Sequence, residues 1–169
     1  DMVKDRAELI KSYTEDGGVG LFICGGYQLM GKYYKDADGN KIPGLGLFDY
    51  YTVAPESRRM RCIGNIVIRT RITGEPVDVV GFENHGGQTH DVRTPFGEVV
   101  VGNGNCSGSS AEGYFEKNVI ATYLHGPCLA KNPEISDYMI GYCLERAGAT
   151  EKPAPLDDTL EKKCREVML

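Results

Sequence analysis

The chain has 169 residues and a net charge of −5 at pH 7, and 41% of its residues are hydrophobic and 25% are charged. This size suits one domain, and this composition is ordinary for a soluble globular protein. The negative charge argues against nucleic acid or an anionic membrane as a partner, and no apolar run approaches the length of a membrane helix. Because the first residues are also too polar for a secretory signal, we predict a cytoplasmic protein without membrane insertion.

Six cysteines are spread along the chain, and none of them belongs to a Cys-x-x-Cys pair. Such wide and irregular spacing argues against a zinc site and against a disulfide scaffold. We therefore expect free thiols, no metal site and no cofactor.

The first part of the chain predicts a helix, a short strand and a second helix. Apolar residues recur at helical spacing over residues 3–14, and a Gly-rich turn ends this helix. An apolar run at residues 21–23 predicts a buried strand, and a short helix over residues 27–34 follows it.

The middle of the chain alternates apolar runs with Gly-rich loops. The runs predict strands over residues 63–72, 76–82, 98–101 and 118–124. Two Gly-rich loops, at residues 81–87 and 102–110, separate them. The pattern of strands and helices indicates an α/β fold.

The last clear element is a helix that starts at Pro133. Asn132 is a suitable N-cap, Pro133 suits the first helical turn, and Gly148 ends the periodic pattern. Residues 152–155 form a stiff Pro-rich linker, and residues 157–169 predict a polar helix at the surface or facing a partner.

Cys24 lies where the first strand turns directly into the next helix. A sharp strand-to-helix turn exposes its side chain at the C-terminal edge of a sheet, and the start of a helix favours a thiolate. Gly25 and Gly26 allow close approach of a substrate, and the Gly25 N–H is well placed to donate to an oxyanion. A single cysteine is otherwise most often a buried structural residue, but this context favours a nucleophile.

A thiolate nucleophile usually needs a base, and His125 follows a strand in a Gly-Pro turn. Because the ends of parallel strands meet at one sheet edge, we predict a Cys24–His125 dyad. An ordinary loop histidine is the alternative for His125. His85 is a second candidate base, or lines the pocket with Glu83, and His90 is expected to be solvated.

A substrate with an α-carboxylate needs a cation, and Arg61 is the best candidate because it leads into a strand. Arg58 and Arg59 are expected to be more exposed. The alternative for all three is a solvated charged face.

Four motifs in order resemble the CobB/CobQ-like branch of class I glutamine amidotransferases, and more closely the glutaminase subunits of lipid II isoglutaminyl synthases. The motifs are Ile23-Cys-Gly-Gly-Tyr-Gln28, Gly44-Leu-Gly46, Val80-Gly-Phe-Glu-Asn-His-Gly-Gly87 and Thr122-Tyr-Leu-His-Gly-Pro127. The resemblance covers residues 19–148. It implies a flavodoxin-like class I glutaminase sheet, mostly parallel and with helices on both faces.

The resemblance also implies an activity and a partner. Family members hydrolyse L-glutamine to glutamate and ammonia, and a Mur-ligase-like synthase subunit uses the ammonia to amidate D-glutamate in the peptidoglycan precursor. By resemblance Cys24 is the nucleophile, His125 the general base and acid, and Gly25 an oxyanion donor. The expected substrate-binding residues are Arg61, Gln28, Glu83 and His85.

Three departures from the family pattern stand out. Pro127 occupies the position where many members carry an acid, so Glu83, Asp49 or another acid is left to orient the histidine. Phe22 replaces a glycine before the nucleophile. The family's N-terminal βα portion, roughly 50–80 residues at ordinary element lengths, is missing.

We therefore expect residues 1–150 to form an amidotransferase domain that is incomplete at its N-terminus, followed by a linker and helix at residues 151–169. Without the missing portion's second oxyanion donor, this chain should be nearly inactive, because one such donor is worth on the order of 10²–10³ in rate. Uncovered sheet edges should also favour self-association.

Other functions compete with this hypothesis. One is the glutaminase domain of a cobyrinate or cobyrate amidating enzyme, although no P-loop motif is present. Another is a non-catalytic domain of the same fold that binds a partner, against which the retained Cys24 and His125 argue. A third is a cysteine peptidase or deglycase on a related fold.

Overall fold

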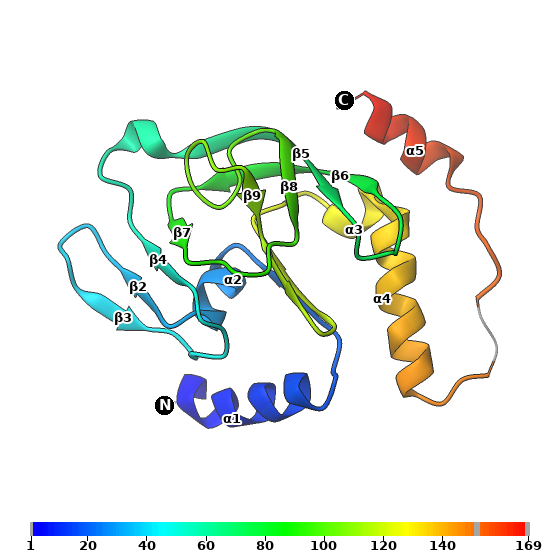
Figure 1. The fold of residues 1–169 in the computed structure, drawn as a ribbon, viewed down its shortest axis with the longest axis horizontal. Helices are drawn as coiled ribbons and strands as arrows, with labels where there is room; N and C mark the ends of the chain where they lie inside the picture. Colours follow the sequence, from blue (N-terminus) through cyan, green and yellow to red (C-terminus); the bar gives the residue numbers. More distant parts are fainter. Residues whose placement is uncertain (1, 151–152, 168–169) are drawn as a thin grey trace.

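The structure is a computed structural model that describes residues 2–150 and 153–167 (Figure 1). Its centre is a pair of short parallel strands, β1 (Gly20–Ile23) and β11 (Val119–Thr122), and β10 (Tyr114–Glu116) runs antiparallel to β11. All four residues of β11 are buried, as expected for a strand covered on both faces. The two predicted apolar strands therefore pair with each other directly.

Two helices flank β1 in the sequence. The first, α1 (Met2–Glu15), agrees with the predicted helix, and α2 (Gly25–Met30) begins directly after Cys24. The second helix is shorter than predicted, because the chain turns at Gly31 and residues 33–35 form a strand. A side chain at Gly31 would lie 2.7 Å from the Tyr50 ring, so this tight turn needs a glycine.

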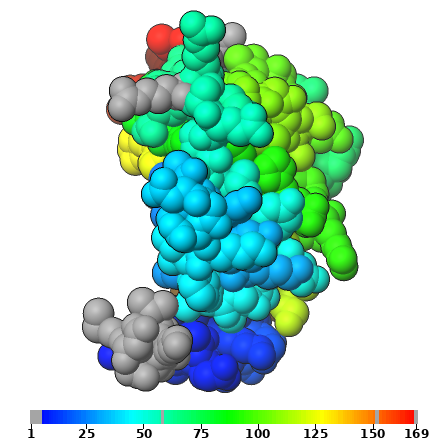
Figure 2. All heavy atoms as spheres, turned by 90° about the vertical axis from the view of Figure 1, so that its left-hand side faces the viewer, coloured from blue at the N-terminus to red at the C-terminus, as the bar shows by residue number. Residues whose placement is uncertain are grey.

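Two further sheets complete the fold. One has the order β3 (Lys41–Pro43), β2 (Tyr33–Lys35), β4 (Tyr51–Val53), β7 (Gln88–His90). The other has the order β6 (Val77–His85), β5 (Cys62–Thr70), β8 (Gly97–Val101), β9 (Ala111–Glu112), and a 3-10 turn, η1 (Arg58–Met60), precedes β5. Figure 2 shows residues of β2–β4, in light blue and cyan, above the blue α1 on one side of the molecule.

The α/β class is confirmed, but the sheets are not mostly parallel. Among the described residues only β1–β11 and β2–β4 pair in parallel, and the other strand pairs are antiparallel. Strands such as β5 and β6 follow each other through a short turn, which permits only antiparallel pairing.

The predicted polar loop at residues 81–87 is also corrected. Residues 81–85 continue β6 and pair with residues 62–66 of β5, so the loop shrinks to the two glycines Gly86 and Gly87. Glu83 and His85 point to the buried side of this strand, while Phe82 and Asn84 point to the exposed side. These residues resemble a loop in the sequence because they are polar. They nevertheless form a strand, since the buried polar side chains are hydrogen-bonded.

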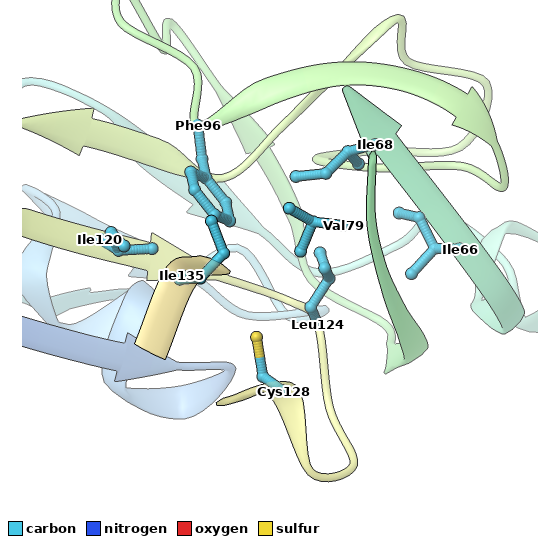
Figure 3. Close-up of a cluster of buried hydrophobic side chains, with 8 residues drawn as sticks. All are labelled: Ile66, Ile68, Val79, Phe96, Ile120, Leu124, Cys128 and Ile135. Atoms are coloured by element: carbon cyan, nitrogen blue, oxygen red, sulfur yellow. The ribbon is translucent and has the colours of Figure 1, made fainter. Parts of the chain in front are cut away.

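Two hydrophobic clusters cover opposite faces of β11. Ile120 belongs to the first cluster and Ala121 to the second, as the alternation of a strand requires. Figure 3 shows the first cluster, in which β5, β6 and β11 meet the C-terminal helices; its buried members are Ile66, Ile68, Val79, Phe96, Ile120, Leu124, Cys128 and Ile135. The second cluster packs Tyr27 and Met30 of α2 against Ala121. Helices therefore lie on both faces of the parallel pair, as predicted.

The helix predicted from Pro133 is α4 (Pro133–Arg146), preceded by the short α3 (Cys128–Lys131). Asn132 makes no side-chain cap bond to α4, contrary to prediction. Its amide instead accepts from Val80 N at 2.8 Å, and donates to Val80 O at 2.8 Å and to Cys128 O at 2.6 Å. These bonds join the helices to β6 at a fully buried position.

The C-terminal segment folds back on this helical side, opposite the β2–β3 hairpin (Figure 1). The predicted helix is α5 (Thr159–Glu166), where Arg165 forms a two-bond ion pair with Glu134 of α4 at 2.9 and 3.0 Å. Part of the predicted linker, residues 151–152, and residues 168–169 lie outside the described residues. No helix in the described ranges has the length and apolar character needed to span a membrane.

Cys24 occupies a strained turn between β1 and α2. Its backbone angles are φ 52° and ψ −104°, and positive φ occurs at only two other non-glycine residues of the described chain. Its N–H donates to Thr122 O at 2.9 Å, and its carbonyl accepts from Gln28 N at 3.0 Å. The bonds on both sides hold the residue in a conformation that L-residues rarely adopt.

Replacing Asn132 with Ala should lower the free energy of unfolding by about 2–4 kcal/mol, because buried backbone groups of β6 lose their partners. Urea unfolding followed by circular dichroism measures the change. Asp137→Ala, at an exposed position of α4, is the control and should leave the transition in place. Equal behaviour of the two variants would contradict this role of Asn132.

Replacing Cys24 with Gly should give a more stable protein than replacing it with Ala, by about 1–2 kcal/mol, because only glycine adopts this φ without strain. Both variants lack the thiol, so the comparison isolates the backbone. Thermal and urea unfolding test the prediction. An Ala variant as stable as the Gly variant would show that the turn is unstrained.

Candidate functional site

The Cys24 side chain lies at the C-terminal edge of the parallel strand pair. The residue is half-buried, and the space where Gly25 would carry a side chain has no atom within 4 Å. The space beside Gly25 is therefore open to a substrate. Cys24 and Phe22, which replaces the family's glycine, both pack in part against the second cluster.

His125 lies at the same edge, three residues after β11 ends. The register pairs Ile23 with Thr122, which places Cys24 beside Tyr123. The His125 backbone is held by two bonds to Phe82 of β6, with its N–H donating at 2.9 Å and its carbonyl accepting at 3.1 Å. Its Nε2 atom is buried and has no hydrogen-bond partner among the residues that the structure describes.

His85 lies beneath this edge, on the buried side of β6. Its ring stacks on Tyr123 with centroids 3.6 Å apart and planes 3° apart, and its Nδ1 lies 2.8 Å from Gly87 O. Burial lowers the pKa of His85, and the nearby His125 adds to this effect. In the neutral ring, Nδ1 donates to the Gly87 carbonyl.

Tyr123 connects several of the predicted residues. Its hydroxyl lies 2.7 Å from Thr89 Oγ1 and accepts from Gln28 Nε2 at 3.2 Å. A side chain at Gly87 would lie 2.4 Å from the same Gln28 nitrogen, so this close packing requires glycine. The structure thus brings Gln28 and His85 to opposite parts of one tyrosine.

Arg61 lies beside the end of β6 that carries His85. Its Nη2 donates to Asn84 Oδ1 at 2.8 Å, and the side chain is exposed. The pairing of Cys62 with His85 brings the arginine next to Gly86. Within the described residues this exposed cation is hydrogen-bonded only to the neutral Asn84 amide, so it is available to a carboxylate.

Glu83 and Asp49 have other partners. The buried Glu83 carboxylate accepts from Asn103 N, Asn103 Nδ2 and Gly104 N at 2.7–3.2 Å, so it anchors the loop at residues 102–110. Asp49 is exposed and forms ion pairs with Lys32 and Arg93. None of these hydrogen bonds and ion pairs involves His125.

His90, expected from the sequence to be solvated in a polar loop, lies in a strand and is partly buried. It belongs to β7, where it pairs with Tyr51 of β4, and its ring lies 5.7 Å from the Tyr51 ring. It thus contributes to a different sheet from Cys24 and His125.

Glu112, a fully buried acid on β9, is a candidate site residue that the sequence alone does not predict. Its Oε1 accepts from Thr122 Oγ1 at 2.7 Å and from Tyr123 N at 2.6 Å. No motif marks Glu112, and its only local signal is an acid next to a predicted loop. Within residues 2–150 and 153–167, no group of three or more His, Cys, Asp or Glu residues is arranged to hold a metal ion.

Comparisons with known proteins agree on one family. The model of the CobB/CobQ-like glutamine amidotransferase domain matches residues 2–133. The chain is 45% identical to the lipid II isoglutaminyl synthase (glutamine-hydrolyzing) subunit GatD of Staphylococcus aureus, over 95% of this chain and 63% of the relative. It is 37% identical to the same subunit of Streptococcus pneumoniae, over 98% of this chain and 64% of the relative.

A more distant relative is a probable cobyric acid synthase of Methanococcus maripaludis, which is 34% identical over 78% of this chain and 27% of the relative. The chain thus spans a little under two thirds of the length of the two GatD relatives. The match covers the strand, turn and helix around Cys24 and the strand that leads to His125. The chain belongs to the CobB/CobQ-like glutamine amidotransferase family.

Proposed function

We propose that this domain hydrolyses L-glutamine through a thioester on Cys24 and supplies ammonia for amidation of a peptidoglycan precursor. One observation carries the proposal: the half-buried thiol lies on a strained turn whose N–H is bonded to Thr122, in the strand that leads to His125. Such a turn is typical of nucleophiles in α/β enzymes.

The first half of the reaction forms the acyl-enzyme. The Cys24 thiolate attacks the side-chain amide carbon of glutamine, and the carbonyl oxygen becomes an oxyanion that accepts from the Gly25 N–H. The carbon–nitrogen bond then breaks, and the His125 imidazolium protonates the nitrogen so that it leaves as ammonia. The product is a γ-glutamyl thioester.

The second half releases glutamate. His125, now neutral, takes a proton from water, and the resulting hydroxide attacks the thioester carbon. The carbon–sulfur bond breaks and returns the thiolate. Both halves use only side chains, backbone donors and water, so the reaction needs no cofactor.

Binding of glutamine requires groups for its α-carboxylate and for its chain. The exposed Arg61, held by Asn84, is the proposed partner of the carboxylate. Gln28 and His85 are proposed to line the glutamine pocket, and both contact Tyr123, one at its hydroxyl and the other at its ring. Glu83 is proposed to act on this pocket only by holding the loop at residues 102–110 in place.

The partner and the acceptor are proposed from the relatives. The two GatD proteins are named as subunits of lipid II isoglutaminyl synthase. We propose that this protein likewise pairs in the cytoplasm with a Mur-ligase-like synthase subunit, which adds the ammonia to D-glutamate of the peptidoglycan stem. No nucleic acid takes part in this scheme.

A second candidate is the glutaminase domain of an enzyme that amidates cobyrate, because of the similarity to a probable cobyric acid synthase. The two candidates share the Cys24 chemistry and differ in the acceptor. The lower identity and the smaller share of this chain that matches favour the first candidate. A partner-binding domain without catalysis is the remaining alternative.

A diazo-ketone analogue of glutamine should label Cys24 and no other cysteine, because only this thiol is expected to lie at the substrate carbonyl. The reagent is added to the intact protein in the presence of its partner, and peptide mass spectrometry locates the label. Excess L-glutamine should slow the labelling.

Cys24→Ser is the matched variant. It should not be labelled, and its glutaminase rate should fall by at least about 10³-fold. His125→Gln should slow labelling without moving it to another residue. Labelling of several cysteines, or none, would favour the partner-binding domain without catalysis.

Replacing Arg61 with Met should raise the KM for glutamine by about 10–100-fold, because one charge-assisted contact to the α-carboxylate is lost. Arg61→Lys should recover part of the loss. Steady-state kinetics measure the change, and Arg59→Met in the 3-10 turn is the control. A KM unchanged in Arg61→Met would remove this residue from the pocket.

A further inference from the structure

Glu112 is a fully buried acid that the proposed mechanism does not use. One of its oxygens, Oε1, accepts from the Thr122 hydroxyl at 2.7 Å and from the Tyr123 N–H at 2.6 Å. The other oxygen, Oε2, is buried and has no hydrogen-bond partner within residues 2–150 and 153–167. Burying a carboxyl group with one oxygen unpaired costs free energy that an apolar residue in the same place would not cost. We therefore expect this acid to have a function that an apolar residue could not supply.

The peptide that Glu112 holds supports both halves of the dyad. The carbonyl of Thr122 accepts from Cys24 N at 2.9 Å, and the N–H on the other side of the same trans peptide, that of Tyr123, donates to Glu112. The Thr122 hydroxyl also accepts from Leu124 N at 3.1 Å, one residue before His125. A shift of this peptide would therefore move the nucleophile and the base together.

Tyr123 extends the effect of this peptide into the pocket. Its ring stacks on His85, and its hydroxyl accepts from Gln28. The Tyr123 N–H donates to Glu112. The carboxyl group therefore holds the Tyr123 backbone, and with it the position of the Tyr123 side chain.

We propose that Glu112 is a positioning residue for the nucleophile and its base, because its carboxyl group fixes the Thr122–Tyr123 peptide on which both depend. The proposal rests on the proposed glutaminase function for the identity of those two groups. It takes the place of Glu83 and Asp49, whose oxygens have other partners, as the acid that orders the site.

Ionisation of Glu112 gives this role a distinct signature. Burial raises the pKa of Glu112 to about 7, and the hydrogen bonds from Thr122 and Tyr123 only partly oppose the increase. The titratable groups facing it from the packed elements are Tyr27 of α2, Glu83 of β6, Tyr123 after β11 and Cys128 of α3. Near neutral pH its two bonds change from neutral to charge-assisted ones, which are shorter and stronger.

The first test uses the intact protein with its partner and measures kcat and KM for glutamine from pH 5.5 to 8.5. Glu112→Ala should lower kcat by about 10²-fold, the size expected for a small misplacement of reacting groups, and should raise KM by a smaller factor, because Tyr123 also contacts the proposed glutamine pocket. Glu112→Gln keeps an acceptor at Oε1 but cannot ionise, so a step in kcat near pH 7 that comes from Glu112 should be present in the wild type and absent in this variant.

A second readout does not need catalysis. The rate at which iodoacetamide alkylates Cys24, followed by peptide mass spectrometry, should show the same step near pH 7 in the wild type and lack it in Glu112→Gln. Thr122→Val removes one hydrogen bond to the carboxyl group and should also lower kcat. This variant keeps the proposal testable if Glu112→Ala fails to fold. Glu116→Gln on β10, an exposed carboxyl near the same strand, is the control and should match the wild type.

The outcomes separate the two proposals. If the wild type hydrolyses no glutamine, the proposed function fails, and the alkylation profile alone decides the role of Glu112. If Glu112→Gln keeps the step near pH 7 in both profiles, or Glu112→Ala matches Glu116→Gln in kcat, Glu112 is not a positioning residue.

Discussion

The hydrogen bond from Cys24 N to Thr122 O is the contact on which the candidate site depends. It extends the parallel pairing of β1 and β11 by one residue beyond the last strand pair, Ile23 with Thr122. On one strand the chain then turns sharply into α2, and on the other it continues to His125. The register thereby aligns the two chain segments that lead to Cys24 and His125, and Phe82 of β6 holds the backbone of the second segment.

The packing around β11 explains why this register is unambiguous. A slip of one residue would exchange Ile120 and Ala121 between the two clusters, and a cavity and a clash would result. The same strand passes from apolar contacts into buried polar ones at Thr122. There Glu112, Tyr123 and their partners replace hydrophobic packing by hydrogen bonds with defined directions, which suits a site that must hold reacting groups in place.

Local patterns in the sequence were sufficient for the elements that carry the site. The apolar run before Cys24, the two glycines and the helix start together predicted the turn, and the strand ending at residue 124 predicted the place of His125. These features depend on neighbours within a few residues. The α/β class and the start of α4 at Pro133 followed in the same way.

The predictions that failed depend on contacts between distant parts of the chain. Asn132 looked like a helix cap, but its partner Val80 lies 52 residues away and satisfies the same amide. Residues 81–85 looked like a loop because their polar side chains find buried partners, such as Asn103 for Glu83, that no local pattern reveals. Glu112 was not predicted for the same reason, because its role depends on hydrogen bonds to the end of β11, which no pattern near Glu112 indicates.

The most direct measurement is a crystal structure of the intact protein after reaction with the diazo-ketone analogue of glutamine. We expect a covalent bond to Cys24 Sγ, with the ligand's carbonyl oxygen about 2.7–3.1 Å from Gly25 N and the His125 ring beside the sulfur. The Thr122–Tyr123 peptide should remain bonded to Glu112. A ligand attached elsewhere, or a His125 ring turned away from the sulfur with the ligand bound, would contradict the account.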